Sequence, residues 1–96
     1  MHVVEVIRLR LATANRDEII AQISKLAIQL GLDEINIYRH ATVDTDLSIH
    51  LDHRDVEIDA PFDGRSLSSL LKEFGLVNYS RWVEVSKNKP SDRERG

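Results

Sequence analysis

The sequence predicts a single α+β domain in which two helices cover one face of a four-stranded antiparallel sheet. Three observations support this fold class. Two segments have the period of an amphipathic helix, four have the alternation of a half-buried strand, and turn residues separate them. The order along the chain is β-α-β-β-α-β, which is the ferredoxin-like arrangement.

The first strand and the first helix occupy the first third of the chain. Residues 3–12 are rich in β-branched side chains and alternate apolar with charged positions toward their end, which predicts a strand. The apolar side chains of residues 16–30 follow helical spacing. Asn15 and Glu18 have the spacing of a capping box, and Gly31 directly follows the helical pattern. We therefore expect the helix to begin after Asn15 and to end before Gly31.

The rest of the chain predicts a hairpin, a second helix and a last strand. Residues 34–41 and 47–53 alternate apolar and polar side chains on either side of a turn. The apolar parity changes at residues 52–55, where we expect a bulge or a turn. Residues 66–74 have one apolar helical face and begin at a serine suited to cap it. Residues 77–86 predict the fourth strand.

The parity of the strands predicts which side chains face the helices. With the apolar series on the helix side, the opposite series projects from the uncovered face, here called the open face. The helix-side series is Leu9, Leu11, Ile35, Ile37, Leu47, Ile49, Leu51, Val83 and Val85. The open-face series is Val4, Val6, Arg8, Arg10, Tyr38, His40, Ser48, His50, Asp52, Trp82 and Glu84.

An open face of this composition is unusual for a surface that meets only water. Two valines, a tyrosine and a tryptophan would lie on it together, and monomeric proteins rarely expose apolar patches of that kind. We therefore predict a homodimer in which a second copy of the chain covers the open face. Plain exposure to solvent and a different partner are the alternatives.

Seven open-face side chains form the predicted ligand-binding site. They are Arg8, Arg10, Tyr38, His40, His50, Asp52 and Trp82. The two arginines suit a small anionic ligand, such as a carboxylate, held by charge-assisted hydrogen bonds. The alternative for each arginine is a cross-strand ion pair with Asp52 or Glu84.

The segment "IHLDHRD", residues 49–55, concentrates two histidines and two aspartates. Because successive strand residues point to opposite faces, His50 and Asp52 share the open face, whereas His53 points away from it. Structural hydrogen bonding is the favoured role for these histidines. General acid–base chemistry and metal binding are the alternatives.

The register of the second and third strands decides how these groups meet. The preferred register has a three-residue loop at 44–46 and puts His40 opposite His50. A second register puts Tyr38 opposite His50 instead. In the first, His40, His50 and Asp52 would form a two-histidine, one-carboxylate set of the kind that binds metals. The spacing alone is unspecific, so we predict no metal and no cofactor.

Composition excludes several classes of function. The chain has no cysteine, so it has no disulfide, no thiolate nucleophile and no sulfur-ligated zinc. Residues 1–86 carry nine basic and fourteen acidic side chains, a net −5, which argues against binding to nucleic acid. No segment approaches the roughly 18 apolar residues of a membrane span, so we expect no membrane partner and a cytoplasmic location. Residues 87–96 are polar, with a net charge of +2, and predict a flexible tail beyond the single domain at 1–86.

At "INIYRHATVDTDLSIHL" and "GRSLSSLLKEFGLVNYSRWVEV" the chain resembles small bacterial proteins of the dimeric α/β-barrel kind, the group that contains the antibiotic-biosynthesis monooxygenases. The resemblance covers most of residues 3–86. It implies a ferredoxin-like fold and a dimer whose two sheets enclose an interior, which enzymes of the group use for cofactor-free oxygenation or for decomposing reactive compounds. No catalytic motif of the group matches residue by residue, so the resemblance implies the fold and the dimer and no activity.

The chain also resembles the small-molecule-sensing regulatory domains of amino-acid metabolism, which share the fold. Their Asp-x-Pro-Gly entry to the first helix is absent, since "TANRDE" stands there. Our first hypothesis is therefore a small homodimeric domain that binds a small ligand at the open face. The second is a cofactor-independent monooxygenase-like enzyme with Tyr38, His40, His50 and Trp82 around the substrate. The third is a purely structural interaction module.

Overall fold

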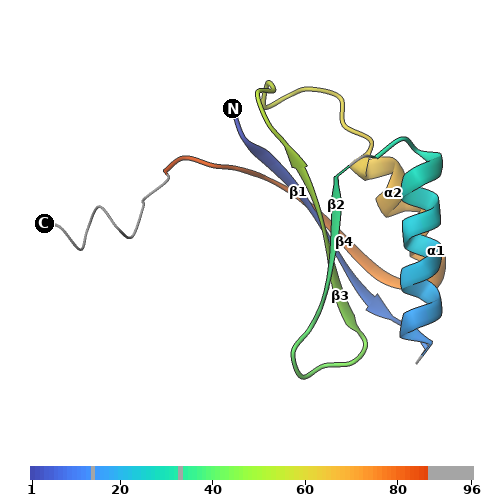
Figure 1. The fold of residues 1–96 in the computed structure, drawn as a ribbon. Helices are drawn as coiled ribbons and strands as arrows, with labels where there is room; N and C mark the ends of the chain where they lie inside the picture. The colour runs from blue at the N-terminus through green and yellow to red at the C-terminus, as the bar shows by residue number, and fades with distance from the viewer. Residues whose placement is uncertain (14, 33, 87–96) are drawn as a thin grey trace, which may run out of the picture.

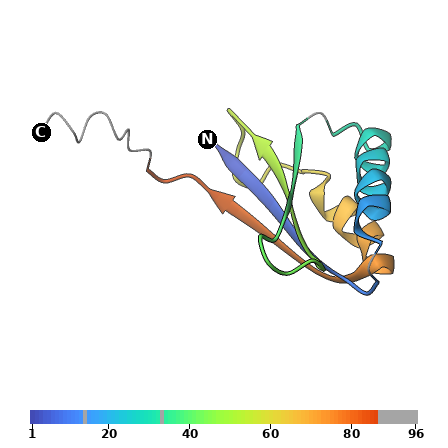
Figure 2. The same ribbon diagram turned by 60° about the horizontal axis from the view of Figure 1, so that its bottom comes forward.

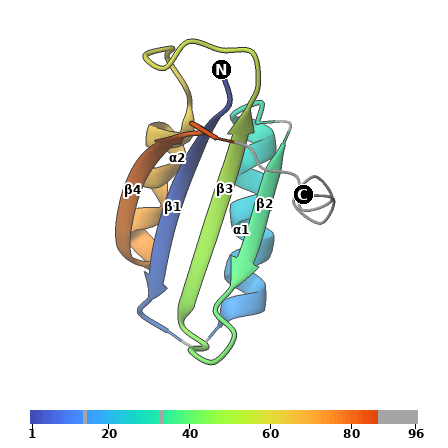
Figure 3. The same ribbon diagram turned by 90° about the vertical axis from the view of Figure 1, so that its left-hand side faces the viewer.

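The computed structural model describes residues 1–13, 15–32 and 34–86. Its elements are β1 (Val3–Leu11), α1 (Arg16–Gln29), β2 (Ile35–Arg39), β3 (Asp46–His53), α2 (Gly64–Leu71), the 3₁₀ turn η1 (Lys72–Phe74) and β4 (Gly75–Val83). The strands form one antiparallel sheet in the order β2-β3-β1-β4. Both helices lie on one side of this sheet (Figure 1), and the opposite side is uncovered (Figure 3). The α+β ferredoxin-like fold is confirmed.

The core lies between the sheet and the two helices. On β1 every second residue from Val3 to Leu11 is buried, as strand alternation requires. The fully buried side chains of the central strands pack against those of the helices. Among the largest of them are Ile7, Leu9, Ile23, Ile49, Leu51, Leu67 and Leu71. The predicted apolar parity of β1, β2 and β3 is therefore correct.

The end of α1 has the predicted glycine termination. Gly31 has a φ of 73°, a conformation that glycine adopts without steric cost. The Gly31 amide donates to the Ile28 carbonyl at 3.0 Å, and the Leu32 amide donates to the Ala27 carbonyl at 2.9 Å. This pair of bonds is a Schellman motif, which satisfies carbonyls at the helix end.

The predicted caps at the helix starts are wrong. Asn15 precedes α1, but its side chain makes no capping hydrogen bond, and its ψ of 57° lies outside the extended region that an N-cap normally adopts. The second helix begins at Gly64 after Asp63, two residues before the serine expected to cap it, Ser66. Packing of the apolar helix face decides the start of short helices more than a single cap does.

Both predicted registers of the β2–β3 hairpin are wrong. Asn36 lies opposite His50, and Tyr38 lies opposite Ser48. The connection spans residues 40–45 in place of a three-residue loop, and the His40 amide donates to the carbonyl of Asp46 at 2.9 Å. The connection projects past the end of the sheet (Figures 1 and 2). With the longer loop, each residue of β2 lies opposite a β3 residue an even number of positions away from the predicted one. Each side chain therefore keeps its predicted face of the sheet but has a different cross-strand neighbour.

The last strand begins two residues and ends three residues before the predicted bounds of 77–86. It begins at Gly75 and ends at Val83, and the Glu84 amide makes a last backbone bond to His2 at 3.0 Å. Because β1 starts at Val3, residues beyond Glu84 have no strand beside them. Val85 is consequently 93% exposed, and its predicted place in the helix-side series is wrong. The predicted flexible tail, residues 87–96, lies outside the described residues.

The connection from β3 to α2 begins where a parity change was predicted. β3 ends at His53, and Asp55 has a φ of 56°, so the chain turns there, as expected for residues 52–55. The segment 54–63 then crosses to the helix side of the sheet (Figure 1). None of the described helices is both long enough and apolar enough to cross a membrane.

Candidate functional site

Six of the seven predicted site residues project from the sheet on its open face. Arg8 and Arg10 come from β1, Tyr38 from β2, His50 and Asp52 from β3, and Trp82 from β4. Trp82 is 62% exposed and Tyr38 is 51% exposed. The valines predicted for this face, Val4 and Val6, are half-buried among their neighbours.

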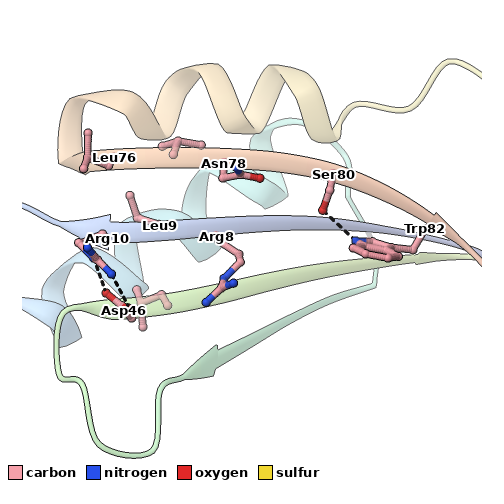
Figure 4. Close-up of a pocket in the computed structure, with 10 residues that line it drawn as sticks. Arg8, Leu9, Arg10, Asp46, Leu76, Asn78, Ser80 and Trp82 are labelled. Atoms are coloured by element: carbon pink, nitrogen blue, oxygen red, sulfur yellow. Dashed lines mark hydrogen bonds and ion pairs between the residues drawn. The ribbon is translucent and has the colours of Figure 1, made fainter.

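A shallow hollow of about 560 Å³ occupies the β1–β4 side of the open face. Its side chains are Arg8, Arg10, Asp46, Leu76, Asn78, Ser80 and Trp82 (Figure 4). At one end the Arg10 guanidinium donates to the two Asp46 carboxylate oxygens at 3.1 and 3.4 Å. This bond lowers the pKa of the Asp46 carboxyl. At the other end the Trp82 indole donates to the Ser80 hydroxyl at 2.8 Å.

Arg8 lies between these two anchored ends. Within the described part of the chain no carboxylate pairs with its guanidinium, which extends over the sheet toward β3 (Figure 4). Its cross-strand neighbours, Ser48 and Asn78, are polar and uncharged. The hollow therefore presents an unpaired positive charge between an ion pair and an indole ring.

The predicted partners of the arginines, Asp52 and Glu84, are bound to His2 instead. The two ring nitrogens of His2 lie 2.9 Å from an Asp52 oxygen and 3.2 Å from a Glu84 oxygen. A carboxylate can only accept, so both bonds form fully when both ring nitrogens carry a proton. The bond to Asp52, followed by that to Glu84, raises the pKa of His2. Arg10 forms a cross-strand ion pair with Asp46, so the predicted partners of the arginines, Asp52 and Glu84, are wrong.

The predicted pairing of His40 with His50 is wrong. His40 lies in the β2–β3 connection, where its Nδ1 accepts the amides of Thr42 at 3.1 Å and Val43 at 3.0 Å. The ring of His50 contacts Tyr38 instead, with centroids 4.8 Å apart. Throughout residues 1–13, 15–32 and 34–86, no group of three or more histidine, cysteine, aspartate or glutamate side chains is arranged to hold a metal.

A second polar cluster, on the helix side of the sheet, escaped the sequence analysis. Glu5 is completely buried on β1. One carboxylate oxygen lies 2.7 Å from Nε2 of His53, and the other accepts the hydroxyl of Tyr79 at 2.5 Å. Arg81 donates to the Tyr79 oxygen at 3.3 and 3.4 Å. These four residues are called the Glu5 cluster below.

The 54–63 segment closes over the Glu5 cluster. Phe62 stacks on the His53 ring at a centroid distance of 3.9 Å, and the Arg81 guanidinium lies 4.7 Å from the Phe62 ring. The same guanidinium donates to the carbonyls of Ile58 and Ala60 at 3.0 and 3.2 Å. Arg81 therefore ties the segment to the sheet.

Burial sets the electrostatics of the Glu5 cluster. Burial raises the pKa of the Tyr79 phenol, and the hydrogen bond to Glu5 raises it further. An isolated buried carboxylate is costly, and charge-assisted hydrogen bonds offset that cost. At Gly64, the first residue of α2, an added Cβ would lie 2.1 Å from a Glu5 oxygen. The absence of a Cβ at position 64 leaves the space that the Glu5 carboxylate occupies.

Strand parity was the signal that could have revealed this cluster. Glu5 stands in the same alternating series as Val3 and Ile7, so its burial followed from the predicted strand. Tyr79 and Arg81 likewise stand in the half-buried series of β4, which is flanked by the exposed residues Asn78 and Trp82. A charged residue in a buried series requires a polar partner, so the sequence could have predicted a polar cluster around Glu5.

No family model, curated protein or solved structure matches the chain. The fold class therefore rests on the observed topology of the sheet and its two helices.

Proposed function

We propose that the chain is a homodimeric ligand-binding domain whose two open faces pack against each other and enclose a small anion-bearing molecule. The observation that carries the proposal is the unpaired Arg8 guanidinium in a hollow walled by the exposed Trp82 indole.

The apolar content of the open face supports the dimer. Trp82, Tyr38 and Leu76 are each more than half exposed. A second copy related by a two-fold axis would present the same patch, so the apolar groups of both copies would lie in one interface. Burying such side chains is worth about 1.5–3 kcal/mol each, which favours association.

The charge of the hollow supports an anionic ligand. Packing two open faces together would remove water from the Arg8 guanidinium, and an unpaired buried charge is strongly unfavourable. Guanidinium groups bind carboxylates through two parallel hydrogen bonds. A ligand with a carboxylate and an aromatic or aliphatic body would satisfy Arg8 and also contact Trp82.

The same interior would suit a second function, cofactor-independent oxygenation, in line with the resemblance to the antibiotic-biosynthesis monooxygenase group. The observation in its favour is the contact of the Tyr38 ring with the His50 imidazole at 4.8 Å, a base beside an aromatic surface. Oxygen uptake with catechol, lost in His50→Gln and retained in His40→Gln, would support this function over simple binding.

The dimer is tested by placing carboxylates on the open face. Val4 and Trp82 are cross-strand neighbours on it, and the double variant Val4→Asp/Trp82→Asp should be monomeric, because unpaired charges at an interface are costly. Ile28→Asp is the matched control, since Ile28 is 76% exposed on α1. Light scattering should give a dimer mass for the wild type and the control. A monomeric wild type would refute the proposal.

The ligand class is tested with benzoate and its uncharged analogue benzamide. Binding of each compound is measured by Trp82 fluorescence and by calorimetry. Benzoate should bind more tightly than benzamide, and Arg8→Gln should remove that preference. Arg39→Gln is the control, because Arg39 is an exposed arginine of the helix-side series at the edge of the sheet. Equal binding of the two compounds to the wild type would argue against a carboxylate site at Arg8.

A further inference from the structure

A groove of about 440 Å³ lies on the helix side of the sheet, away from the open-face hollow. The end of β3, the residues after α1 and the 54–63 segment form its walls. Its apolar side chains include Leu32, Val56, Pro61 and Phe62, and His53 of the Glu5 cluster also lines it. Its volume falls in the range of small-molecule sites.

The hydrogen bond to Glu5 determines which nitrogen of His53 is free. Nε2 of His53 lies 2.7 Å from a Glu5 oxygen. A carboxylate offers no proton, so Nε2 carries the hydrogen and Nδ1 of the neutral ring holds a lone pair. Nδ1 has no partner within the described residues, and Arg16 Nε is the one buried side-chain polar atom there that lacks a partner. Nδ1 of His53 therefore keeps some exposed surface, on a side chain that is 20% exposed.

The ring of His53 is held in place on two sides. The bond from Nε2 to Glu5 fixes its direction, and the stack on Phe62, with the two ring planes 2° from parallel, fixes its plane. Glu5 is itself held by the Tyr79 hydroxyl and by the lack of space beside Gly64. An imidazole oriented by a buried carboxylate is the arrangement of a general base, because the carboxylate stabilises the imidazolium that forms on proton uptake.

We propose that this groove is a proton-transfer site in which Nδ1 of His53 activates a water molecule for attack on a small uncharged carboxylic ester. Nδ1 takes one proton of the water, and the oxygen forms a bond to the acyl carbon as the carbonyl π bond opens; that π bond forms again when the carbon–alkoxy bond breaks. The alcohol then leaves with its bonding electrons and takes a proton back from His53. Water is the one co-reactant. Glu5 does not touch the substrate and acts as a positioning residue.

The remaining groups of the groove support an uncharged substrate. Glu34, Asp52 and Asp63 line it as well, against one cation, Arg54, so the charged lining is net negative and would disfavour an anionic ester. The apolar walls around Phe62 would hold an aryl or alkyl group. This site is independent of the open face, so the proposed homodimer and its ligand can be refuted without affecting it.

The experiment measures release of 4-nitrophenolate from 4-nitrophenyl acetate by the full chain. His53→Gln keeps a donor toward Glu5 while removing the base, and it should lower the rate at least tenfold, because general-base catalysis contributes about 10²–10⁴-fold. His40→Gln, which removes an exposed histidine outside the groove, should keep the wild-type rate. The anionic ester 4-nitrophenyl hydrogen succinate should react more slowly than the acetate.

Glu5→Gln tests the positioning role. This variant keeps the shape and removes the charge that stabilises the imidazolium, so the pH–rate profile should shift as well as fall. A purely structural role would change the rate without moving the profile.

A measurement on the wild type covers the case in which the His53 variant does not fold. Treatment with diethyl pyrocarbonate should lower the activity in proportion to the fraction of His53 that is modified. Mass spectrometry of peptides measures that fraction. A wild-type rate no greater than that of four free imidazoles per chain would overturn the proposal. So would activity that survives loss or modification of His53.

Discussion

Replacing Gly64 by alanine tests how tightly the Glu5 carboxylate is enclosed. The added Cβ would lie 2.1 Å from one carboxylate oxygen, 2.7 Å from the other and 2.5 Å from the carbon between them. Atoms cannot approach that closely, so either α2 or the carboxylate must move. Glu5 has no exposed surface and therefore no empty space to move into.

The expected cost follows from the bonds that such a movement breaks. A hydrogen bond to a charged group contributes about 1.5–3 kcal/mol, and overpacking a core costs about 1–3 kcal/mol. Alanine is favoured over glycine in a helix by about 1 kcal/mol. Losing one of the bonds from His53 or Tyr79 therefore gives a net destabilisation of about 1.5–5 kcal/mol. That is a large part of the total stability of about 5–15 kcal/mol for a domain.

Urea denaturation measures this cost, and Gly31→Ala is the matched control. Gly31 has a positive φ and no atom within 4 Å of an added Cβ, so its replacement costs only about 1–2 kcal/mol of backbone strain. At Gly31 an asparagine variant should be more stable than the alanine variant, because asparagine tolerates that conformation. At Gly64 the asparagine variant should be less stable than the alanine variant. A Gly64→Ala variant as stable as Gly31→Ala would refute the enclosed carboxylate.

Two further predictions concern protonation. Because the folded state raises the pKa of His2, its bonds to Asp52 and Glu84 stabilise the fold fully below pH 6.5 and are lost as the pH rises through the folded pKa. In thermal denaturation, His2→Gln should therefore differ in stability from the wild type below pH 6.5 and should converge with it at alkaline pH. The raised pKa of Tyr79 means that its contribution is present below pH 10 and is lost as the pH rises through the folded value. Tyr79→Phe should cost about 1.5–3 kcal/mol at neutral pH in urea denaturation, since Glu5 loses a donor, and equal stability of variant and wild type would contradict that bond.

Local patterns in the sequence were sufficient to predict the fold. The alternation in β1 and β3 and the helical spacing in α1 each match the period of one kind of element, and their order admits few topologies. Burial of Ile7 and Ile49 therefore followed from parity alone. The caps were predicted less well, because a capping side chain competes with tertiary packing that the local sequence does not contain.

The neighbours of the site residues could not be predicted in the same way. Parity decides the face of a strand, but pairing also depends on the length of the connecting loop, which local residues determine weakly. The β2–β3 connection spans residues 40–45, so Tyr38 became the neighbour of His50 and His40 left the sheet. His2, the partner of Asp52, precedes the first predicted strand, so strand parity assigns its side chain to neither face.

The segment "IHLDHRD" distributes its polar groups between the two faces of the sheet. His50 and Asp52 belong to the open face, whereas His53, one position later, reaches Glu5 on the helix side. A slip of β3 by one residue would exchange these faces, and it would also expose the apolar residues that anchor β3 in the core. The hydrophobic core therefore fixes which histidine serves which site, although no polar contact joins His50 to His53. This explains how one short stretch rich in ionisable residues places His50 on the open face and His53 beside Glu5.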